Sequence, residues 1–207
     1  MADKVIIVDY GMGNMWSVFS ALRFLGCSPV ISSDADQVAA ADTLILPGVG
    51  SFRKAMEALE MHGLDQALRE AVLVRKRKIL GICLGMQLFA EYGQEDGDHR
   101  GLGFISGSVE RFARDELGAL KVPHVGFNHV RSSPDSVLFN GIASPSDFYF
   151  VHSYRLLNSG LPGKPGLCHY GIEFLSAYEY ENIFATQFHP EKSQTNGLKL
   201  LNNFLAA

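Results

Sequence analysis

Residues 78–88 read Lys-Ile-Leu-Gly-Ile-Cys-Leu-Gly-Met-Gln-Leu, and this stretch decides the fold. Residues 78–82 form a short apolar run of strand length, and residues 84–92 carry apolar side chains at helical spacing. A glycine lies two positions before Cys83 and another two positions after it, which keeps a crowded backbone free of Cβ clashes. The stretch therefore predicts a sharp turn between strand and helix that exposes the Cys83 side chain as a nucleophile. A buried cysteine in a glycine-rich turn is the alternative.

The chain before this stretch alternates strand and helix patterns. Apolar runs predict buried strands, and apolar residues that recur every three or four positions predict helices packed on them. The expected strands are residues 5–9, 29–32 and 43–46, and the expected helices are residues 15–25, 52–60 and 64–75. Repeated strand–helix units imply a mostly parallel sheet with helices on both faces.

The C-terminal half has a different pattern, because β-branched and aromatic residues lie between frequent turn sequences. Short strands, many of them antiparallel, are expected at residues 107–112, 128–131, 148–154, 166–170 and 183–188. Ser193 is expected to cap a last helix that runs to about Leu205. The sequence thus predicts a single α/β domain over residues 1–207, with a mostly parallel central sheet flanked by helices and an additional, largely antiparallel portion.

Composition argues against several classes of function. Of the 207 residues, 47% are apolar and 19% are charged, which is typical of a globular protein with a sizeable core. The net charge of −4 argues against a protein that binds nucleic acid through phosphate contacts. No apolar stretch approaches the length of a membrane span, and the N-terminus lacks the layout of a signal peptide. A soluble, cytoplasmic protein is expected.

The cysteines and histidines suggest neither a disulfide framework nor a metal site. The cysteine count is three, and none form a C-x-x-C pair. Cys27 and Cys168 are interpreted as core residues. His99, His124 and His129 do not show a metal-binding spacing. No metal and no cofactor are expected.

Two charged segments are interpreted as surface features. The run Arg75-Lys76-Arg77-Lys78 is interpreted as the charged end of a surface helix, where cations suit the helix dipole. A patch that docks a partner is the alternative. The loop of residues 95–99 is expected to be a solvated turn.

A second candidate for chemistry lies 106 residues after Cys83, in Gln-Phe-His-Pro-Glu at residues 187–191. His189 follows a strand-like run, so it can lie at a strand end beside the cysteine turn. A neutral imidazole takes a thiol proton, and the imidazolium gives it to a leaving amine. Glu191 is suited to hold the ring by accepting its other N–H. A plain loop is the alternative for this segment alone.

A third candidate is Pro-Gly-Val-Gly at residues 47–50, directly after an expected strand. Glycines there let backbone N–H groups face a ligand. Together with the N–H of Leu84, at the start of the expected helix, such groups form an oxyanion hole. A simple turn is the alternative.

Together these motifs resemble the class-I, triad-type glutamine amidotransferases, and among them the glutaminase subunits of imidazole glycerol phosphate synthase. The resemblance runs nearly end to end and rests on several segments in the same order. They are DYGMGN at residues 9–14, PGVG at 47–50, GICLGMQ at 81–87, PHVGFN at 123–128, YFVHSY at 149–154 and QFHPEKS at 187–193.

The resemblance implies a reaction. Cys83, with His189 and Glu191, attacks the side-chain amide of glutamine, forms a glutamyl thioester and releases ammonia, after which water releases glutamate. The resemblance also implies that Gly50 and Leu84 supply the oxyanion N–H groups, and that the peptide near Val49 turns first.

The resemblance further implies how substrate and partner are bound. Gln87, Ser153 and Tyr154 match positions that hold glutamine. Asn14 and Lys192 match positions near a (β/α)8 cyclase subunit, which receives the ammonia in a heterodimer and closes the imidazole ring of a histidine precursor.

The sequence departs from the family at the loop that faces this partner. The family usually has Met and Trp where this chain has Val125 and Phe127. Drift is one reading, and a paralogue that feeds a sugar amidotransferase in surface-polysaccharide synthesis is another. A stand-alone cysteine hydrolase or peptidase and a non-catalytic binding module are further alternatives. The loops that match the interface argue against the hydrolase, and the intact Cys83, His189 and Glu191 argue against the binding module.

Overall fold

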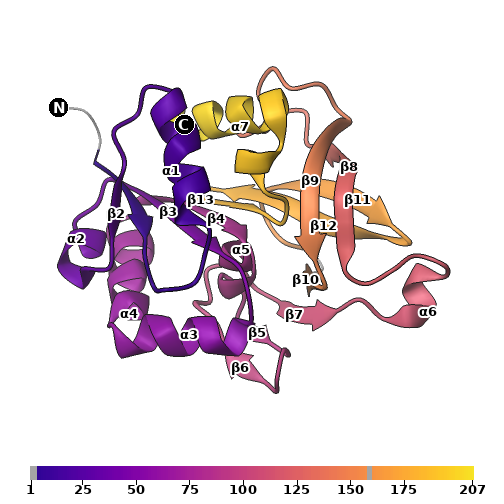
Figure 1. Cartoon of the computed structure of the whole chain (residues 1–207), viewed down its shortest axis with the longest axis horizontal. Coiled ribbons are helices and arrows are strands. Elements are labelled where there is room, and N and C mark those ends of the chain that lie inside the picture. Colours follow the sequence, from indigo (N-terminus) through magenta and orange to yellow (C-terminus); the bar gives the residue numbers. More distant parts are fainter. Residues whose placement is uncertain (1–3, 158–159) are drawn as a thin grey trace.

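The structure, a computed structural model, describes residues 4–157 and 160–207 and contains a large and a small β-sheet with helices packed around them (Figure 1). The larger sheet has the strand order β2-β1-β3-β4-β13-β12-β11-β8-β9. From β2 to β13 neighbouring strands are parallel, and from β13 to β9 they are antiparallel. The bounds of the parallel strands are β1 Val5–Val8, β2 Val30–Ser32, β3 Thr43–Gly48, β4 Lys78–Cys83 and β13 Ile183–Thr186. The antiparallel ones are β8 His124–Ser132, β9 Ser146–His152, β11 Lys164–Tyr170 and β12 Ile172–Tyr180.

The smaller sheet has the order β10-β7-β5-β6. Its strands are β5 Tyr92–Gly93, β6 His99–Arg100, β7 Ser108–Arg111 and β10 Tyr154–Leu157. β10 follows β9 after a single residue, Ser153, so the chain passes from the large sheet to the small one at this point. The expected α/β fold, mostly parallel in its first half and antiparallel in its second, is confirmed.

Helices cover both faces of the parallel strands (Figure 1). They are α1 Met15–Phe24, α2 Ala35–Ala39, α3 Phe52–Met61, α4 Leu64–Arg69, α5 Leu84–Leu88 and α7 Gln194–Ala206. The short helix α6, Arg114–Leu117, lies apart from them beyond β7 (Figure 1). Alternate side chains of β1 point to opposite faces. Ile6 belongs to the core beneath α2 to α5, and Ile7 belongs to the core beneath α1 and α7. Burial on both faces explains why these strands are continuously apolar.

Two expected helices differ from their apolar patterns, one in helix type and one in length. The helix expected at residues 64–75 is α-helical to Arg69 and continues as a π-helical turn, Glu70–Val74. The helix expected at residues 84–92 ends at Leu88, and the chain enters the short strand β5. The spacing of apolar residues does not indicate the end of this helix, because Phe89 and Ala90 stay buried in the core after the helix has ended.

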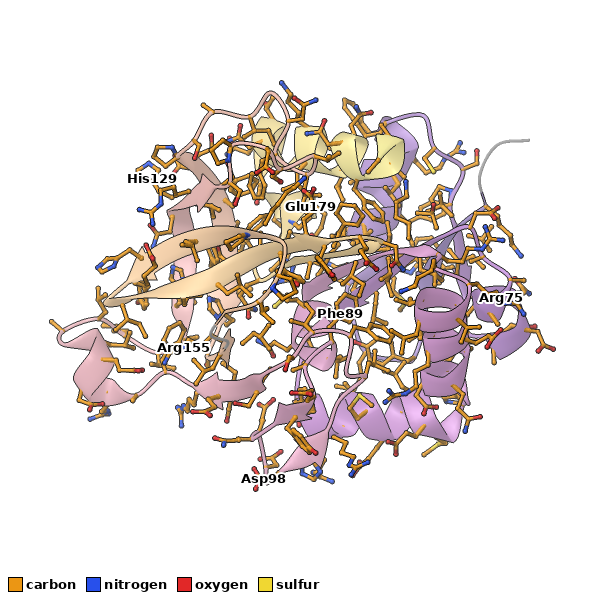
Figure 2. All side chains as sticks on the ribbon, turned by 180° about the vertical axis from the view of Figure 1, so that it is seen from behind. Arg75, Phe89, Asp98, His129, Arg155 and Glu179 are labelled. Carbon is orange, nitrogen blue, oxygen red and sulfur yellow. The ribbon has the colours of Figure 1, made fainter. Side chains whose placement is uncertain are left out.

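Strand β12 was missed by the sequence pattern, because it does not alternate. Residues 174–179 are all buried, and they include the polar Ser176 and Glu179. The Glu179 carboxylate, near the centre of the view in Figure 2, accepts hydrogen bonds from Ser136 Oγ at 2.7 Å and Leu138 N at 3.0 Å, and it pairs with Lys164 Nζ at 3.0 Å. These partners make the buried charge tolerable, but they come from distant parts of the chain. Helix α2 and strands β6 and β10 were also not predicted.

The basic run is not simply the end of a helix. Arg75, at the rim of the molecule in Figure 2, follows the π-helical turn, and Lys78 already begins β4. Arg75 pairs with Glu70 at 3.0 Å, Lys76 with Glu181 at 3.4 Å and Arg77 with Asp42 at 3.1 Å. The acidic partners balance most of the run, which leaves little net positive charge on this surface.

Candidate active site

Cys83 lies at the junction of β4 and α5. Its backbone has φ 56° and ψ −108°, a conformation that L-residues rarely adopt. The turn is possible because two glycines approach neighbouring backbone closely. A Cβ on Gly81 would lie 2.8 Å from the Gly85 carbonyl, and a Cβ on Gly85 would overlap the Leu46 carbonyl oxygen. The sharp strand-to-helix turn expected from the sequence is present, but Cys83 is not in the open as expected, since it is only 5% exposed.

The register of the sheet explains why the two distant motifs meet. β13 is parallel to β4, with Thr186 opposite Ile82. β13 ends at Thr186 and β4 ends at Cys83, one residue after Ile82. The residues that follow the two strands therefore leave the sheet at the same edge. The side chain of Gln187 reaches Cys83, with Nε2 at 3.7 Å from Sγ. Cys83 Sγ also lies 3.9 Å from the carbonyl of Val151 at the end of β9.

His189 and Glu191 form a buried pair beside this edge. His189 Nδ1 lies 2.8 Å from Glu191 Oε1, and their side chains are 3% and 2% exposed. The backbone N–H of His189 donates to the carbonyl of Tyr149 at 2.9 Å. Burial lowers the pKa of His189, but hydrogen bonding and charge interactions with Cys83 and Glu191 outweigh it and raise the pKa from 6.5 to about 9.

The contact between His189 and Cys83 is close without being well aligned. His189 Nε2 is buried and has no partner of good hydrogen-bond geometry in the described part of the chain, although Cys83 is near enough to raise the pKa of the ring. Catalytic hydrogen bonds often tighten only when substrate binds. The geometry leaves Nε2 available to exchange a proton with a group bound at Cys83.

Ser193 follows this pair and has a different role from the one expected. The helix that it was expected to cap is present as α7, yet its side chain makes no capping hydrogen bond. Instead, Ser193 Oγ donates to the carbonyl of His189 at 2.7 Å and accepts from the N–H of Tyr149 at 2.9 Å. Ser193 is the N-cap residue of α7, as expected, but its hydroxyl ties the His189 loop to β9 instead of capping the helix.

A pocket of about 300 Å³ opens at Cys83. Its size is at the lower end of the range for small-molecule sites. It brings together Cys83 with all the residues expected to stabilise an oxyanion or hold a substrate. The lining residues are Val49, Gly50, Cys83, Leu84, Gln87, Glu95, Pro123, Val151, His152, Ser153 and Tyr154.

The expected oxyanion segment, residues 47–50, begins within β3, because the strand runs two residues further than expected and ends with Gly48 opposite Cys83 on β4. The Tyr10 hydroxyl donates to the carbonyl of Pro47 at 3.0 Å and anchors the segment from below. Val49 is 42% exposed, and Gly50 has φ +109°. Val49 and Gly50 lie beyond the paired end of β3, so the peptide between them has more freedom to turn than the peptide between Pro47 and Gly48.

Gln87 is held by two acceptors at the inner end of the pocket. Its Nε2 donates to the carbonyl of Tyr154 at 3.0 Å and to Gln187 Oε1 at 3.1 Å. Gln87 is 5% exposed and Gln187 is fully buried. The site also contains three residues that the sequence motifs did not single out. They are Gln187, His152 and Tyr10. Gln187 was detectable from its position two residues before His189.

The loop of residues 95–99 is not entirely a solvated turn. Glu95 lines the pocket, and its carboxylate accepts the N–H of Phe52 at 2.8 Å. Asp96 accepts the Ser51 hydroxyl at 3.3 Å. The loop therefore closes one side of the pocket and carries a carboxylate to its edge, a function that composition alone does not indicate.

The three residues expected near a partner all lie on the surface. Asn14 is exposed, and its Oδ1 accepts the Ser17 N–H at 3.4 Å at the start of α1. Phe127 is 51% exposed on β8. Lys192 Nζ lies 5.9 Å from the centre of the Tyr149 ring. Trp16, which the sequence reasoning did not single out, is 68% exposed on α1.

Cys168 is buried in the core, as expected, whereas Cys27 is half-buried at its margin. Residues 4–157 and 160–207 contain no group of three or more His, Cys, Asp or Glu side chains arranged to hold a metal ion. None of the helices in these two ranges has both the length and the apolar character needed to cross a lipid bilayer.

Comparison with known proteins identifies the family. A family model described as glutamine amidotransferase class-I matches residues 6–207. The chain is 46% identical over 203 residues to imidazole glycerol phosphate synthase subunit HisH 1 of Campylobacter jejuni strain RM1221, covering 97% of this chain and 98% of that protein. It is 43% identical over 205 residues to the protein of the same name from Parasynechococcus marenigrum strain WH8102, covering 99% and 98%. For subunit HisH of Acinetobacter baylyi, the identity is 41% over 203 residues, covering 98% and 97%.

Solved structures show the same fold at lower identity. A putative GMP synthase protein from Thermoplasma acidophilum superposes with a TM-score of 0.75 at 21% identity, covering all of this chain and 94% of the other. PurLQS from Thermotoga maritima gives 0.68 at 18% identity, covering 100% and 99%. The family match over residues 6–207 and the relatives at 41–46% identity confirm the expected resemblance, and this chain belongs to the class-I glutamine amidotransferase family.

Proposed function

We propose that this chain is the glutaminase subunit of an imidazole glycerol phosphate synthase, in which it releases ammonia from glutamine for a cyclase subunit of histidine biosynthesis. The observation that carries the proposal is the arrangement of Cys83 at a pocket of about 300 Å³ with the buried His189–Glu191 pair behind it. Relatives at 41–46% identity over almost the whole chain support the choice of pathway.

Cys83 is the nucleophile in the proposed reaction. The raised pKa of His189 keeps the imidazole protonated at neutral pH, and an imidazolium beside a thiolate is the reactive form of such a pair. The thiolate attacks the side-chain carbonyl carbon of glutamine. His189 gives its proton to the departing nitrogen, so that ammonia leaves and a glutamyl thioester remains.

Water completes the cycle. Neutral His189 takes a proton from a water molecule as that water attacks the thioester, and collapse of the intermediate expels the Cys83 thiolate and glutamate. His189 is then an imidazolium again. Glu191 holds Nδ1 of the ring through the 2.8 Å hydrogen bond, which keeps Nε2 directed to the reacting groups.

The pocket residues have matching roles. The N–H groups of Gly50 and Leu84 stabilise the oxyanion, after the peptide at Val49 has turned. Gln87, Ser153 and Tyr154 hold the glutamine. The carboxylate of Glu95 lies at the edge of the same pocket and has the charge required to pair with the α-ammonium group of the substrate.

A (β/α)8 cyclase is the proposed protein partner. Near the mouth of the pocket, β8 and β9 expose the apolar Val125, Phe127 and Val151, at 56%, 51% and 36%. Asn14 and Lys192 border this surface in the proposal. Exposed apolar patches of this kind mark protein interfaces, and capture of ammonia by a docked cyclase prevents its protonation in bulk water.

Two further features complete the proposal. The whole chain acts as one glutamine amidotransferase domain, since the nine-stranded sheet uses strands from both ends of the chain. The protein works in the cytoplasm, where the thiols of Cys27, Cys83 and Cys168 stay reduced.

The test compares two sources of nitrogen in the complex with the cyclase. Cys83→Ala should abolish glutamine-dependent synthesis of the imidazole product and leave ammonia-dependent synthesis within about twofold, since ammonia bypasses the triad. Loss of both activities, with the variant folded and bound to the cyclase, would contradict the proposed role of Cys83.

A further inference from the structure

Strands β8 and β9 form a two-stranded ribbon whose faces have opposite characters. In their antiparallel register, His124 lies opposite His152, and Val125 lies opposite Val151. One face exposes the apolar surface proposed above for the cyclase. The other face is buried, with His124 and His152 only 2% and 6% exposed. A displacement of the ribbon at its outer face is therefore carried directly to these two histidines.

The two histidines are joined in a hydrogen-bond chain with a defined direction. His152 Nδ1 lies 2.8 Å from the carbonyl of Tyr154, which can only accept, so this nitrogen carries the hydrogen. His152 Nε2 is then the acceptor for His124 Nδ1 at 3.1 Å. Burial lowers the pKa of His124 to about 4 and that of His152 to about 3, which keeps both rings neutral with one hydrogen each.

Asn128 fixes the outer end of this chain. Its Oδ1 accepts the His129 N–H at 2.8 Å, which assigns the orientation of the amide. Its Nδ2 then donates to His124 Nε2 at 3.4 Å and to the carbonyl of His169 at 3.1 Å. His124 and Asn128 belong to β8, two strand positions on either side of Gly126.

The inner end of the chain reaches the glutamine pocket. The carbonyl of Tyr154, which accepts from His152, also accepts from Gln87 Nε2 at 3.0 Å. Gln87 in turn donates to Gln187 Oε1 at 3.1 Å, and Gln187 Nε2 lies 3.7 Å from Cys83 Sγ. Gln87, His152 and Tyr154 line the pocket itself. Each donor in this series has its acceptor, from Asn128 to Cys83.

Packing holds His124 rigidly to its strand. Its ring is stacked on Tyr170, with centroids 3.9 Å apart, and on Phe150, with centroids 4.7 Å apart, at 21° in both cases. An apolar ring would fill this position without leaving polar atoms to satisfy. The imidazole instead donates to one neighbour and accepts from another, and such chains couple their members more strongly inside proteins than in water.

We propose that His124 and Asn128 are positioning residues that transmit the placement of the partner-facing strand β8, through His152, to Gln87 and Tyr154 in the glutamine pocket. The inference deepens the proposed function and rests on it. It gives the ribbon a mechanical role, because a cyclase docked on its outer face sets the position of the groups that hold glutamine on its inner face.

The test uses His124→Phe, which keeps the stacked ring and removes both hydrogen bonds, and His124→Asn, whose amide can replace the donor Nδ1. The control is Tyr170→Phe, which keeps the ring stacked on His124 and loses only a hydrogen bond to the Lys121 carbonyl at 2.8 Å. The complex with the cyclase and its nucleotide is assayed for glutaminase KM and kcat, and for cyclase affinity.

His124→Phe should raise the KM for glutamine in the complex about tenfold, because Nε2 of His152 then has no hydrogen-bond donor. Cyclase affinity should stay within about twofold, since His124 is buried, and His124→Asn should restore most of the KM. The control should match the unmodified chain. An unchanged KM in His124→Phe would overturn the proposal, and so would a raised KM that His124→Asn does not restore.

A second measurement keeps the proposal testable if His124→Phe fails to fold. In the unmodified chain, NMR of ¹⁵N-labelled histidine should find the hydrogen on Nδ1 of both His124 and His152. Asn128→Ala should raise the KM for glutamine in the same direction by about threefold. Hydrogen on Nε2 of His152 would contradict the chain. Absence of glutaminase activity in the unmodified complex would instead contradict the proposed function.

Discussion

His189 and Glu191 are joined by a hydrogen bond of 2.8 Å that is almost completely shielded from water. The carboxylate selects the ring tautomer and stabilises the imidazolium, and Glu191→Gln keeps the shape while removing the charge. We predict a fall in glutaminase kcat of about 10²–10⁴-fold in the complex, similar to loss of the carboxylate from other triads. Steady-state kinetics measures it. A kcat within threefold of the unmodified chain, with the fold intact, would contradict this role.

The pKa of His189 is a second test of the same site. Cys83 and Glu191 raise it to about 9, so Cys83→Ala and Glu191→Gln should each lower it toward or below 6.5. Because the folded value exceeds the unfolded one, the stabilisation is complete below pH 6.5 and is lost as pH rises through about 9. NMR titration of His189 gives the pKa, and urea unfolding across this pH window gives the stability. A titration below pH 6.5 in the unmodified chain would exclude the account.

The turn around Cys83 was predictable because its cause is local. Eleven residues contain both the apolar strand and the glycines at positions 81 and 85. These two glycines allow the backbone to pass close to the Gly85 and Leu46 carbonyls. The parallel half of the sheet was predictable for the same reason, since strands buried on both faces are continuously apolar. The meeting of His189 with Cys83 needed the register of β13 against β4, which no local pattern contains.

Gly85→Ala should destabilise the fold by about 3 kcal/mol or more, because the new Cβ overlaps the Leu46 carbonyl in rigid backbone. Gly26→Ala is the matched control. Gly26 has φ +83° with open space around it, so alanine there suffers backbone strain alone, about 1–2 kcal/mol. Urea unfolding of both variants compares the two effects. Equal losses would show that β4 and α5 do not pack as closely as described.

Parts of the site escaped prediction because their partners are distant in sequence. His124 and His152 are 28 residues apart and look like ordinary buried histidines until β8 and β9 are placed in register. Glu95 lies in a polar loop whose composition suggests solvent, and it is the contact with Phe52 N that turns it to the pocket. Ser193 has the residue type of a helix cap, yet tertiary contacts with His189 and Tyr149 use its hydroxyl.

Phe127 tests the proposed partner surface. Phe127→Ala should weaken binding of the cyclase about tenfold or more, since large aromatic side chains at the centre of an interface contribute most of the affinity. Met61→Ala is the control, because Met61 is 79% exposed on α3, outside the β8–β9 ribbon. Calorimetric titration of each variant measures the Kd. If Phe127→Ala binds as tightly as Met61→Ala, the ribbon is not the docking surface.

The most direct test of the central claim measures glutamate released from glutamine by this chain, alone and with the imidazole-forming cyclase and its nucleotide substrate. The account predicts low activity alone, strong stimulation by the loaded cyclase, and complete loss of both in Cys83→Ala. Cysteine-dependent release that the cyclase leaves unchanged would keep the glutaminase and contradict the assignment of this partner. Release that persists in Cys83→Ala would contradict the triad itself.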